Sequence, residues 1–298
     1  MSSWKLSAFA PKTVVQAALL AHDEIEEWDP ALVVSGREVA EDKPVEWVFE
    51  AWYPDKPGPK QKRALAGLFA KAAPQFVSEK LPEEDWVTLS QQGTEPIRAG
   101  RFHVRTPGHD PAPGAINLEI PASQAFGTGH HATTAGCLAM LDAMKRSGTV
   151  VRNLADIGTG TGLLAFAALR LWPRALATAS DIDAVCTGVV EDNARANGVA
   201  MGAHAGEVTM VIAPGMDDPL LAARGPYDLL IANILAGPLI DLAPDFAPAV
   251  APGGNLLLAG LLETQERSVR RAYRRAGFRI AARLVSGDWS ILWLRKRR

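Results

Sequence analysis

The sequence predicts an α/β fold in two parts, and three observations carry this prediction. From Ala115 onward, apolar strand-like segments alternate with helical segments, which is typical of a parallel sheet covered by helices. A glycine-rich turn, Gly158-Thr159-Gly160-Thr161-Gly162, lies where one of these strands meets a helix. The first eighty residues follow the order βαββαβ, which matches a split βαβ, ferredoxin-like α+β unit.

The composition is that of an ordinary globular chain and excludes several classes of protein. The 298 residues have a net charge of −2, with 48% apolar and 21% charged side chains, unlike a disordered protein. A near-neutral chain has no overall field for non-specific nucleic-acid binding. Two cysteines without a CxxC spacing argue against a disulfide framework or a structural zinc site. We find no long apolar span and no secretory signal, and therefore expect a cytoplasmic protein without a membrane partner.

Residues 1–80 are expected to form the smaller domain. Thr13 is a candidate N-cap, and apolar side chains recur after it at steps of three and four, which favours a helix. Prolines and a glycine at 54–59 break the chain before a second helix. The turn-rich residues 81–106 are predicted to be a linker. The predicted elements of residues 1–80 are strands Trp4–Ala10, Ala31–Val39, Val45–Tyr53 and Gln75–Lys80, and helices Thr13–Trp28 and Gln61–Ala73.

Residues 107–298 are expected to form the larger domain around a mainly parallel sheet. Gly277 is typical of the residue that follows a helix end. The predicted strands are Val150–Ile157, Ala175–Asp181, Val208–Ala213, Tyr227–Ala232, Asn255–Ala259, Phe278–Val285 and Trp289–Leu294. The predicted helices are Gly162–Leu171, Ala184–Ala196, Pro238–Val250 and Thr264–Ala276.

The glycine turn and an acid on the next strand favour a nucleoside-bearing ligand. Glycines at a helix N-terminus permit positive φ and a close approach of the backbone to a ligand. The GxGxG spacing fails the dinucleotide pattern GxGxxG because residue 163 is Leu, and no GxxxxGK[ST] motif is present. Asp181 ends the next strand, where a carboxylate accepts hydrogen bonds from ribose hydroxyls. The pattern favours an adenosyl ligand without a pyrophosphate; a tight turn with a solvated Asp181 is the alternative.

Several further segments carry a family resemblance. They are Ala125–Thr134 (AFGTGHHATT), Asp156–Leu164, Asp181–Asp183, Glu191–Val199 (EDNARANGV), Ala232–Leu239 (ANILAGPL) and Pro252–Gly260. Together they resemble the PrmA methyltransferases, which use S-adenosylmethionine to methylate the eleventh protein of the large ribosomal subunit. The resemblance is clear from about Glu84 onward and only general before it. The chain departs from the family pattern at Ala132 and in extra length around 201–206 and 215–224, which we expect to alter the rim of the site.

The resemblance implies a Rossmann-like S-adenosylmethionine-dependent methyltransferase domain preceded by a ferredoxin-like domain. It also implies that the ferredoxin-like domain recognises the substrate and moves relative to the methyltransferase domain. Methyl groups would pass to lysine side chains or the N-terminal amine of the ribosomal protein. Asn233 would lie near the reactive sulfonium and position the amine, and Phe126 and His131 would line the approach of that amine. The residues implied for the cofactor are Thr134, Gly158, Gly160, Asp181 and Asn233.

Other interpretations of these residues stay open. The same motifs fit a lysine methyltransferase with a different protein substrate, and less well a nucleotide-binding oxidoreductase or a non-catalytic RNA- or ribosome-binding module. Thr134 is also explained as a residue that caps or back-bonds its helix, and Asn233 as a turn former. His130 and His131 are also explained as surface residues; because no third ligand is spaced on their element, we expect no metal site.

Two charged segments lie outside these motifs. Acidic side chains gather between Asp23 and Glu50, where they would attract a basic ribosomal protein or simply form a solvated face. Basic side chains gather between Arg267 and Arg298 without aromatic residues for base stacking. We therefore expect a solvated helix face and tail there, with no direct binding of nucleic acid required; contact of this segment with RNA is the alternative.

Overall fold

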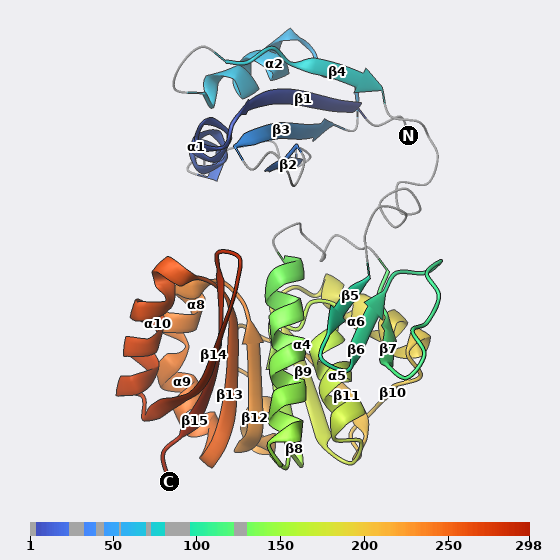
Figure 1. Cartoon of the computed structure of the whole chain (residues 1–298), viewed down its shortest axis with the longest axis vertical. Helices are drawn as coiled ribbons and strands as arrows, with labels where there is room; N and C mark the ends of the chain where they lie inside the picture. The colour runs from blue at the N-terminus through green and yellow to red at the C-terminus, as the bar shows by residue number, and fades with distance from the viewer. Residues whose placement is uncertain are drawn as a thin grey trace. The chain divides into compact units, whose positions relative to one another are not determined.

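The chain consists of two compact units, Met1–Leu89 and Ser90–Arg298. The structure is a computed structural model (Figure 1) and describes residues 4–23, 33–39, 45–53, 55–69, 73–80, 96–121 and 130–298.

The smaller unit has the predicted βαββαβ order. Its elements are β1 (Trp4–Pro11), α1 (Lys12–Asp23), β2 (Val33–Glu38), β3 (Glu46–Tyr53), α2 (Pro59–Gly67) and β4 (Val77–Lys80). The sheet order is β2-β3-β1-β4, and every neighbouring pair is antiparallel. Phe49, Phe69 and Phe76 meet edge to face in its core. The ferredoxin-like prediction is therefore confirmed.

The larger unit is built on an eight-stranded sheet. Its strands are β8 (Asn153–Ile157), β9 (Leu176–Asp181), β10 (Ala200–Met201), β11 (Glu207–Ile212), β12 (Tyr227–Asn233), β13 (Val250–Leu262), β14 (Phe278–Ser286) and β15 (Trp289–Lys296). They lie in the order β10-β11-β9-β8-β12-β13-β15-β14, and β15 alone runs opposite to the other seven strands. The chain winds from β8 toward β9 and β11 and then crosses to β12 on the other side of β8. This reversal creates a switch point between β8 and β12.

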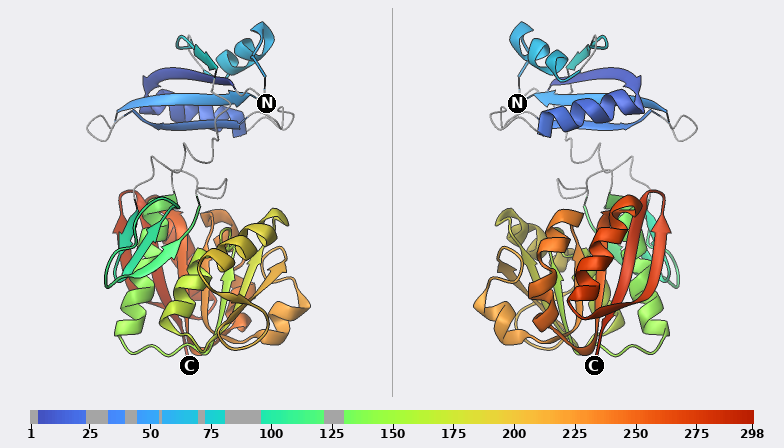
Figure 2. Two further views of the ribbon diagram at one scale, coloured as in Figure 1. Left: turned by 90° about the vertical axis from the view of Figure 1, so that its right-hand side faces the viewer. Right: turned by 90° about the vertical axis from the view of Figure 1, so that its left-hand side faces the viewer.

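Helices cover both faces of this sheet (Figures 1 and 2). One face carries α4 (His130–Arg146), α5 (Leu163–Leu171) and α6 (Val185–Ala196), and the other carries α7 (Pro219–Arg224), α8 (Ala236–Asp241), α9 (Ala243–Ala249) and α10 (Glu263–Arg275). Alternate side chains of β12 supply the two cores, because successive residues of a strand point to opposite faces: Leu229 and Ile231 join one core and Leu230 and Ala232 the other. The Rossmann-like prediction is confirmed. Within the described ranges, no helix is long and apolar enough to cross a membrane.

Two segments differ from their predictions. Residues 97–105, predicted to lie in a linker, form β5 (Ile97–Ala99) and β6 (Phe102–Arg105), which make a three-stranded sheet with β7 (Ile116–Glu119). These strands are too short for periodicity to reveal, yet Phe102 and Val104 are buried against the core around α4. The helix predicted over 238–250 is divided into α8 and α9, because Pro244 has no N–H to continue the helical hydrogen bonds.

A buried carboxylate joins α10 to β14 and β15. Glu266 accepts hydrogen bonds from Arg270 (3.0 Å), Arg283 (2.6 Å) and Ser290 (2.7 Å). Burial alone would raise the pKa of Glu266, but these bonds together lower it. Arg283 also pairs at 2.6 Å with Glu263, whose side chain is 56% exposed.

We expect Glu266→Ala to lower the free energy of unfolding by about 3 kcal/mol, because it leaves the guanidinium of Arg283 beside a buried gap. Glu263→Ala removes an exposed partner of the same arginine and should cost less than about 1 kcal/mol. Urea unfolding of both variants measures the difference. Equal losses would show that the burial of Glu266 does not increase the contribution of this cluster to the free energy of unfolding.

Candidate functional site

Three of the predicted site segments meet at the carboxyl edge of the sheet. The glycine turn follows β8, Asp181 ends β9 and Asn233 ends β12, on both sides of the switch point. The backbone N–H of Gly160 donates to Asp181 Oδ2 at 2.8 Å. A Cβ added to Gly158 would lie 2.3 Å from the Ile234 side chain, directly after Asn233. Ligands of open α/β sheets bind at such a place, so the strands bring the predicted residues together where a ligand is expected.

Each glycine of the turn has its own physical reason. All three have positive φ, at 72° for Gly158, 54° for Gly160 and 81° for Gly162, which favours glycine. A Cβ at Gly158 would strike Ile234 and one at Gly162 would strike the ring of Phe166 at 2.5 Å, whereas one at Gly160 would meet no atom within 4 Å. Gly160 alone therefore presents an open surface to a ligand.

A glycine turn at a helix N-terminus is expected to offer unpaired backbone N–H groups to a ligand, but three N–H groups of this turn already have partners. Those of Gly158 and Thr159 both donate to the carbonyl of Ser180, at 2.8 and 2.9 Å, and that of Gly160 donates to Asp181. These bonds tie the turn to the end of β9. The turn therefore contributes to ligand binding mainly through its shape and its open face at Gly160, and less through unpaired N–H donors.

Asp156, in β8, holds the glycine turn in place through hydrogen bonds. Its carboxylate is buried, and one oxygen accepts hydrogen bonds from the Thr159 hydroxyl (2.8 Å) and the Ala165 backbone (3.1 Å). Burial raises the pKa of Asp156 to about 7, against the opposing effect of these two bonds. Sequence reasoning noticed this acid only as the residue before the turn; the structure adds that it links β8, the turn and α5.

The pKa of Asp156 predicts how the stability of the chain depends on pH. Because the folded value of about 7 lies above the ordinary 3.8, folding favours the protonated carboxyl. Its contribution is fully present below about pH 4 and is lost as pH rises through about 7. The loss amounts to about 4 kcal/mol for three pKa units.

Asp156→Asn should remove this dependence, because the amide oxygen still accepts both bonds and carries no charge. We expect the variant to gain stability relative to the parent protein between about pH 4 and about pH 7 in urea unfolding. Asp192→Asn, at a side chain that is 75% exposed, is the control and should show no such trend. Parallel pH curves for the parent and Asp156→Asn would contradict the raised pKa.

Asp181 keeps acceptor capacity for a ligand. Its two oxygens accept one backbone N–H each, from Gly160 at 2.8 Å and from Asp183 at 3.1 Å. The Cys186 thiol also hydrogen-bonds to this carboxylate. A carboxylate has about four lone-pair sites, so acceptor capacity remains beyond these three bonds. Burial, together with the charge of Asp181, raises the pKa of the neighbouring Cys186 to about 11, so this thiol stays protonated near neutral pH.

Asn233 has a buried oxygen that lacks a donor. Its Oδ1 is inaccessible to solvent and has no hydrogen-bond partner within the described part of the chain. Ser180 Oγ, near the end of β9, is likewise buried without a hydrogen-bond partner among the described residues. No feature of the sequence had identified Ser180. A buried acceptor without a donor costs about 1–3 kcal/mol, so such atoms call for an explanation. A ligand that carries N–H or O–H donors supplies one at this edge.

The family signature before the sheet is only partly described. Thr134, together with Thr133, is buried near the start of α4. His131 is the second residue of α4, but its side chain lies outside the described residues, as do all of Phe126 and the rest of 122–129. The assignments of Phe126, His131 and Thr134 therefore stay predictions.

The extra length between β9 and β12 does not all lie at the rim where we expected it. Gly206 donates from its backbone to Ala175, just before β9 begins. Arg224 donates to the Ala203 carbonyl (3.0 Å) and to Thr178 Oγ1 (3.0 Å). The 202–206 loop and the end of α7 are therefore held at the amino ends of the strands, on the edge opposite the site.

Comparison with known proteins identifies the family. The family model described as ribosomal protein L11 methyltransferase (PrmA) matches residues 14–297. The chain belongs to this family. The PrmA resemblance noted in the sequence is thus confirmed, and it favours a methyltransferase over the oxidoreductase interpretation.

Individual PrmA relatives agree with the family assignment. The ribosomal protein L11 methyltransferase of Rhizobium meliloti (strain 1021) is 45% identical over 219 residues, 72% of each chain. That of Agrobacterium fabrum is 41% identical over 240 residues, covering 79% of this chain and 80% of the relative. A crystal structure of ribosomal protein L11 methylase from Lactobacillus delbrueckii subsp. bulgaricus is 26% identical with a TM-score of 0.58, over 69% of this chain and 100% of that one.

Proposed function

We propose that this PrmA-family chain transfers methyl groups from S-adenosylmethionine to amino groups of ribosomal protein L11, on lysine side chains or the N-terminal amine. The observation that carries the proposal is the buried Oδ1 of Asn233, which has no donor among the described residues. Asn233 ends β12, the strand beside the glycine turn. A neutral amine has N–H groups that fit this acceptor. The cytoplasm, where ribosomal proteins are made, is the compartment that we propose for the reaction.

The residues at the edge fit the cofactor chemically. When bound, S-adenosylmethionine supplies an electrophilic methyl group on a sulfonium. Asp181 has remaining acceptor positions for ribose hydroxyls, and Gly160 has an open face against which a ligand can lie. We assign Thr134, Gly158, Gly160, Asp181 and Asn233 to the binding of this group.

The same residues explain what the protein must do for the amine. A lysine amine has an ordinary pKa near 10.4 and has to lose its proton before its lone pair can react. Burial in a partly dry pocket disfavours the ammonium form. Asn233 is not a base; its Oδ1 accepts an N–H of the neutral amine and so directs the lone pair. In this proposal Phe126 and His131 line the approach of the amine.

We assign substrate recognition to the smaller unit. Exposed carboxylates such as Glu38 suit a basic ribosomal protein. Glu50, which we had counted with them, does not belong to that surface: it is buried and pairs with Arg37 (2.9 Å) and Lys5 (3.4 Å). The recognition surface therefore rests on the remaining acidic side chains.

The direct test is a methyl-transfer assay on the purified chain with radiolabelled S-adenosylmethionine and the mixed large-subunit ribosomal proteins. We expect label on L11 alone, and intact masses that rise by whole methyl groups. Label on a different protein would support a lysine methyltransferase of other specificity. No label, together with thermal stabilisation by NAD but not by S-adenosylhomocysteine, would reject the proposed chemistry.

A further inference from the structure

Charge is distributed very unevenly along the chain. Residues 263–298 carry 11 basic and 3 acidic side chains, a net charge of +8. The remaining 262 residues carry 20 basic and 30 acidic side chains, a net charge of −10. The near-neutral total therefore hides a strongly basic segment, which forms α10, β14 and β15.

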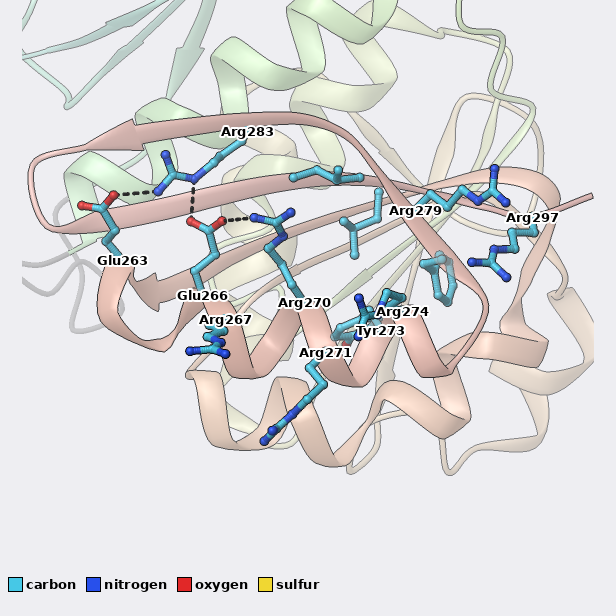
Figure 3. A pocket seen from close by; sticks show the side chains of 13 residues that line it. Glu263, Glu266, Arg267, Arg270, Arg271, Tyr273, Arg274, Arg279, Arg283 and Arg297 are labelled. Carbon is cyan, nitrogen blue, oxygen red and sulfur yellow. Dashed lines mark hydrogen bonds and ion pairs between the residues drawn. The ribbon is translucent and has the colours of Figure 1, made fainter.

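The structure gathers many of these charges around one groove (Figure 3). A hollow of about 830 Å³ lies along α10 and β14, and its arginines are Arg267, Arg270, Arg271, Arg274, Arg279, Arg283 and Arg297. A second hollow shares Arg279 and Arg297 with it and adds Arg295, Lys296 and Arg298. The two hollows therefore adjoin each other at the β14 edge of the sheet, and together we call them the basic groove.

Most of the arginines in the first hollow have no acidic partner. Arg270 and Arg283 pair with Glu266 and Glu263. Among the described residues, no carboxylate pairs with the other five, which are Arg267, Arg271, Arg274, Arg279 and Arg297. Like charges at close range repel one another, and an anion placed between them relieves the repulsion. Guanidinium groups bind the oxygens of phosphates and carboxylates in pairs of hydrogen bonds, so an oxyanion of this kind suits the groove.

The surroundings of the groove favour a nucleic-acid backbone over a membrane. An interfacial helix needs an exposed apolar face, but α10 buries its apolar side chains Val269 and Tyr273 against the sheet. The aromatic residues of the lining, Tyr273 and Phe278, are also buried, so no ring is available to stack on a base. The groove therefore suits contacts with phosphates, and it has no aromatic side chains that could recognise the bases.

We propose that the basic groove of α10, β14 and the 295–298 segment binds the phosphate backbone of RNA. This goes beyond the solvated face expected from the sequence, because arginines of α10 and β14 line one hollow, although Arg267 and Arg271 extend from the side of α10 away from β14 (Figure 3). The choice of RNA rests on the proposed function, since a ribosomal protein is assembled into an RNA particle. RNA held in the groove would bring the enzyme to that particle without taking part in methyl transfer.

The test measures binding of a fluorescein-labelled 20-nucleotide poly(U) to the full chain by anisotropy, without cofactor or substrate protein. We expect salt-dependent binding that weakens roughly tenfold or more in Arg274→Gln/Arg279→Gln/Arg297→Gln, with a slope of log K against log salt smaller by about 2. The control Arg98→Gln/Arg152→Gln/Arg174→Gln removes the same charge from exposed arginines elsewhere in the larger unit and should bind like the parent.

Methylation of isolated L11 should be unchanged in the groove variant, so failure of RNA binding and failure of the proposed reaction are separate results. No binding of poly(U) by the parent, or equal weakening in both triple variants, would overturn the proposal. Tighter binding to polyglutamate or to phosphatidylserine vesicles than to poly(U) would also overturn it, in favour of an acidic protein or a membrane.

Discussion

Replacing Asn233 by alanine is expected to lower kcat for methyl transfer by about 10²- to 10³-fold, the effect of removing one group that stabilises or positions the reacting atoms. The same change should leave the free energy of unfolding unchanged or slightly raised. The reason is that Asn233 Oδ1 is buried without a donor among the residues that the structure describes, and such an atom is a cost to the folded state. Radiolabel transfer and urea unfolding measure the two effects.

A second asparagine provides the matched control. Asn255 on the neighbouring strand β13 is also buried, but it accepts from Trp293 Nε1 at 2.9 Å and donates to the Asp228 carbonyl at 3.2 Å. Asn255→Ala should therefore lose about 1–3 kcal/mol of stability and retain kcat. Full activity of Asn233→Ala would reject our assignment, and so would an activity loss that merely follows a loss of folding.

The sequence predicted well which candidate residues lie together at one edge of the sheet, because the rules that govern this placement are local. A glycine turn after one strand and an acid at the end of the next must lie together in a parallel sheet, since carboxyl ends share one edge. Period-two and period-3.6 patterns were enough to place β8, α5 and β9 within a few residues. The same reasoning placed Asn233 at this edge, although its role still depends on the resemblance.

Features that depend on distant residues were not predictable in this way. The strands β5 and β6 are three and four residues long and are defined by pairing and burial, for which no periodic signal exists. The loop 202–206 looked like part of the rim because chain position alone cannot say at which edge a loop lies. The basic residues of α10 and β14 were visible as charges, but their convergence on one groove appears only in the fold.

Gly260→Ala is expected to impair both folding and catalysis, because it displaces the segment that carries Asn233. Gly260 has a φ of +82°, and a Cβ there would lie 2.3 Å from the carbonyl oxygen of Ile234 and 2.7 Å from its carbonyl carbon. On its other side, the Ile234 side chain lies against Gly158. Ile234 is thus held between two glycines, and backbone atoms that meet a new methyl group cannot rotate away as a side chain would.

We expect Gly260→Ala to lose about 3 kcal/mol or more of stability, of which roughly 1–2 kcal/mol comes from the positive φ alone. Gly277→Ala isolates that conformational part, since Gly277 has a φ of +92° and its added Cβ would meet no atom within 4 Å. Any Gly260→Ala protein that still folds should transfer methyl groups about 10²-fold more slowly, because a shift of about 1 Å in a positioning group has that effect. If both glycine variants instead lose the same stability and keep full activity, the close approach of Gly260 to Ile234 does not set the position of Asn233. The carboxyl edge of the sheet then tolerates a displacement of Asn233.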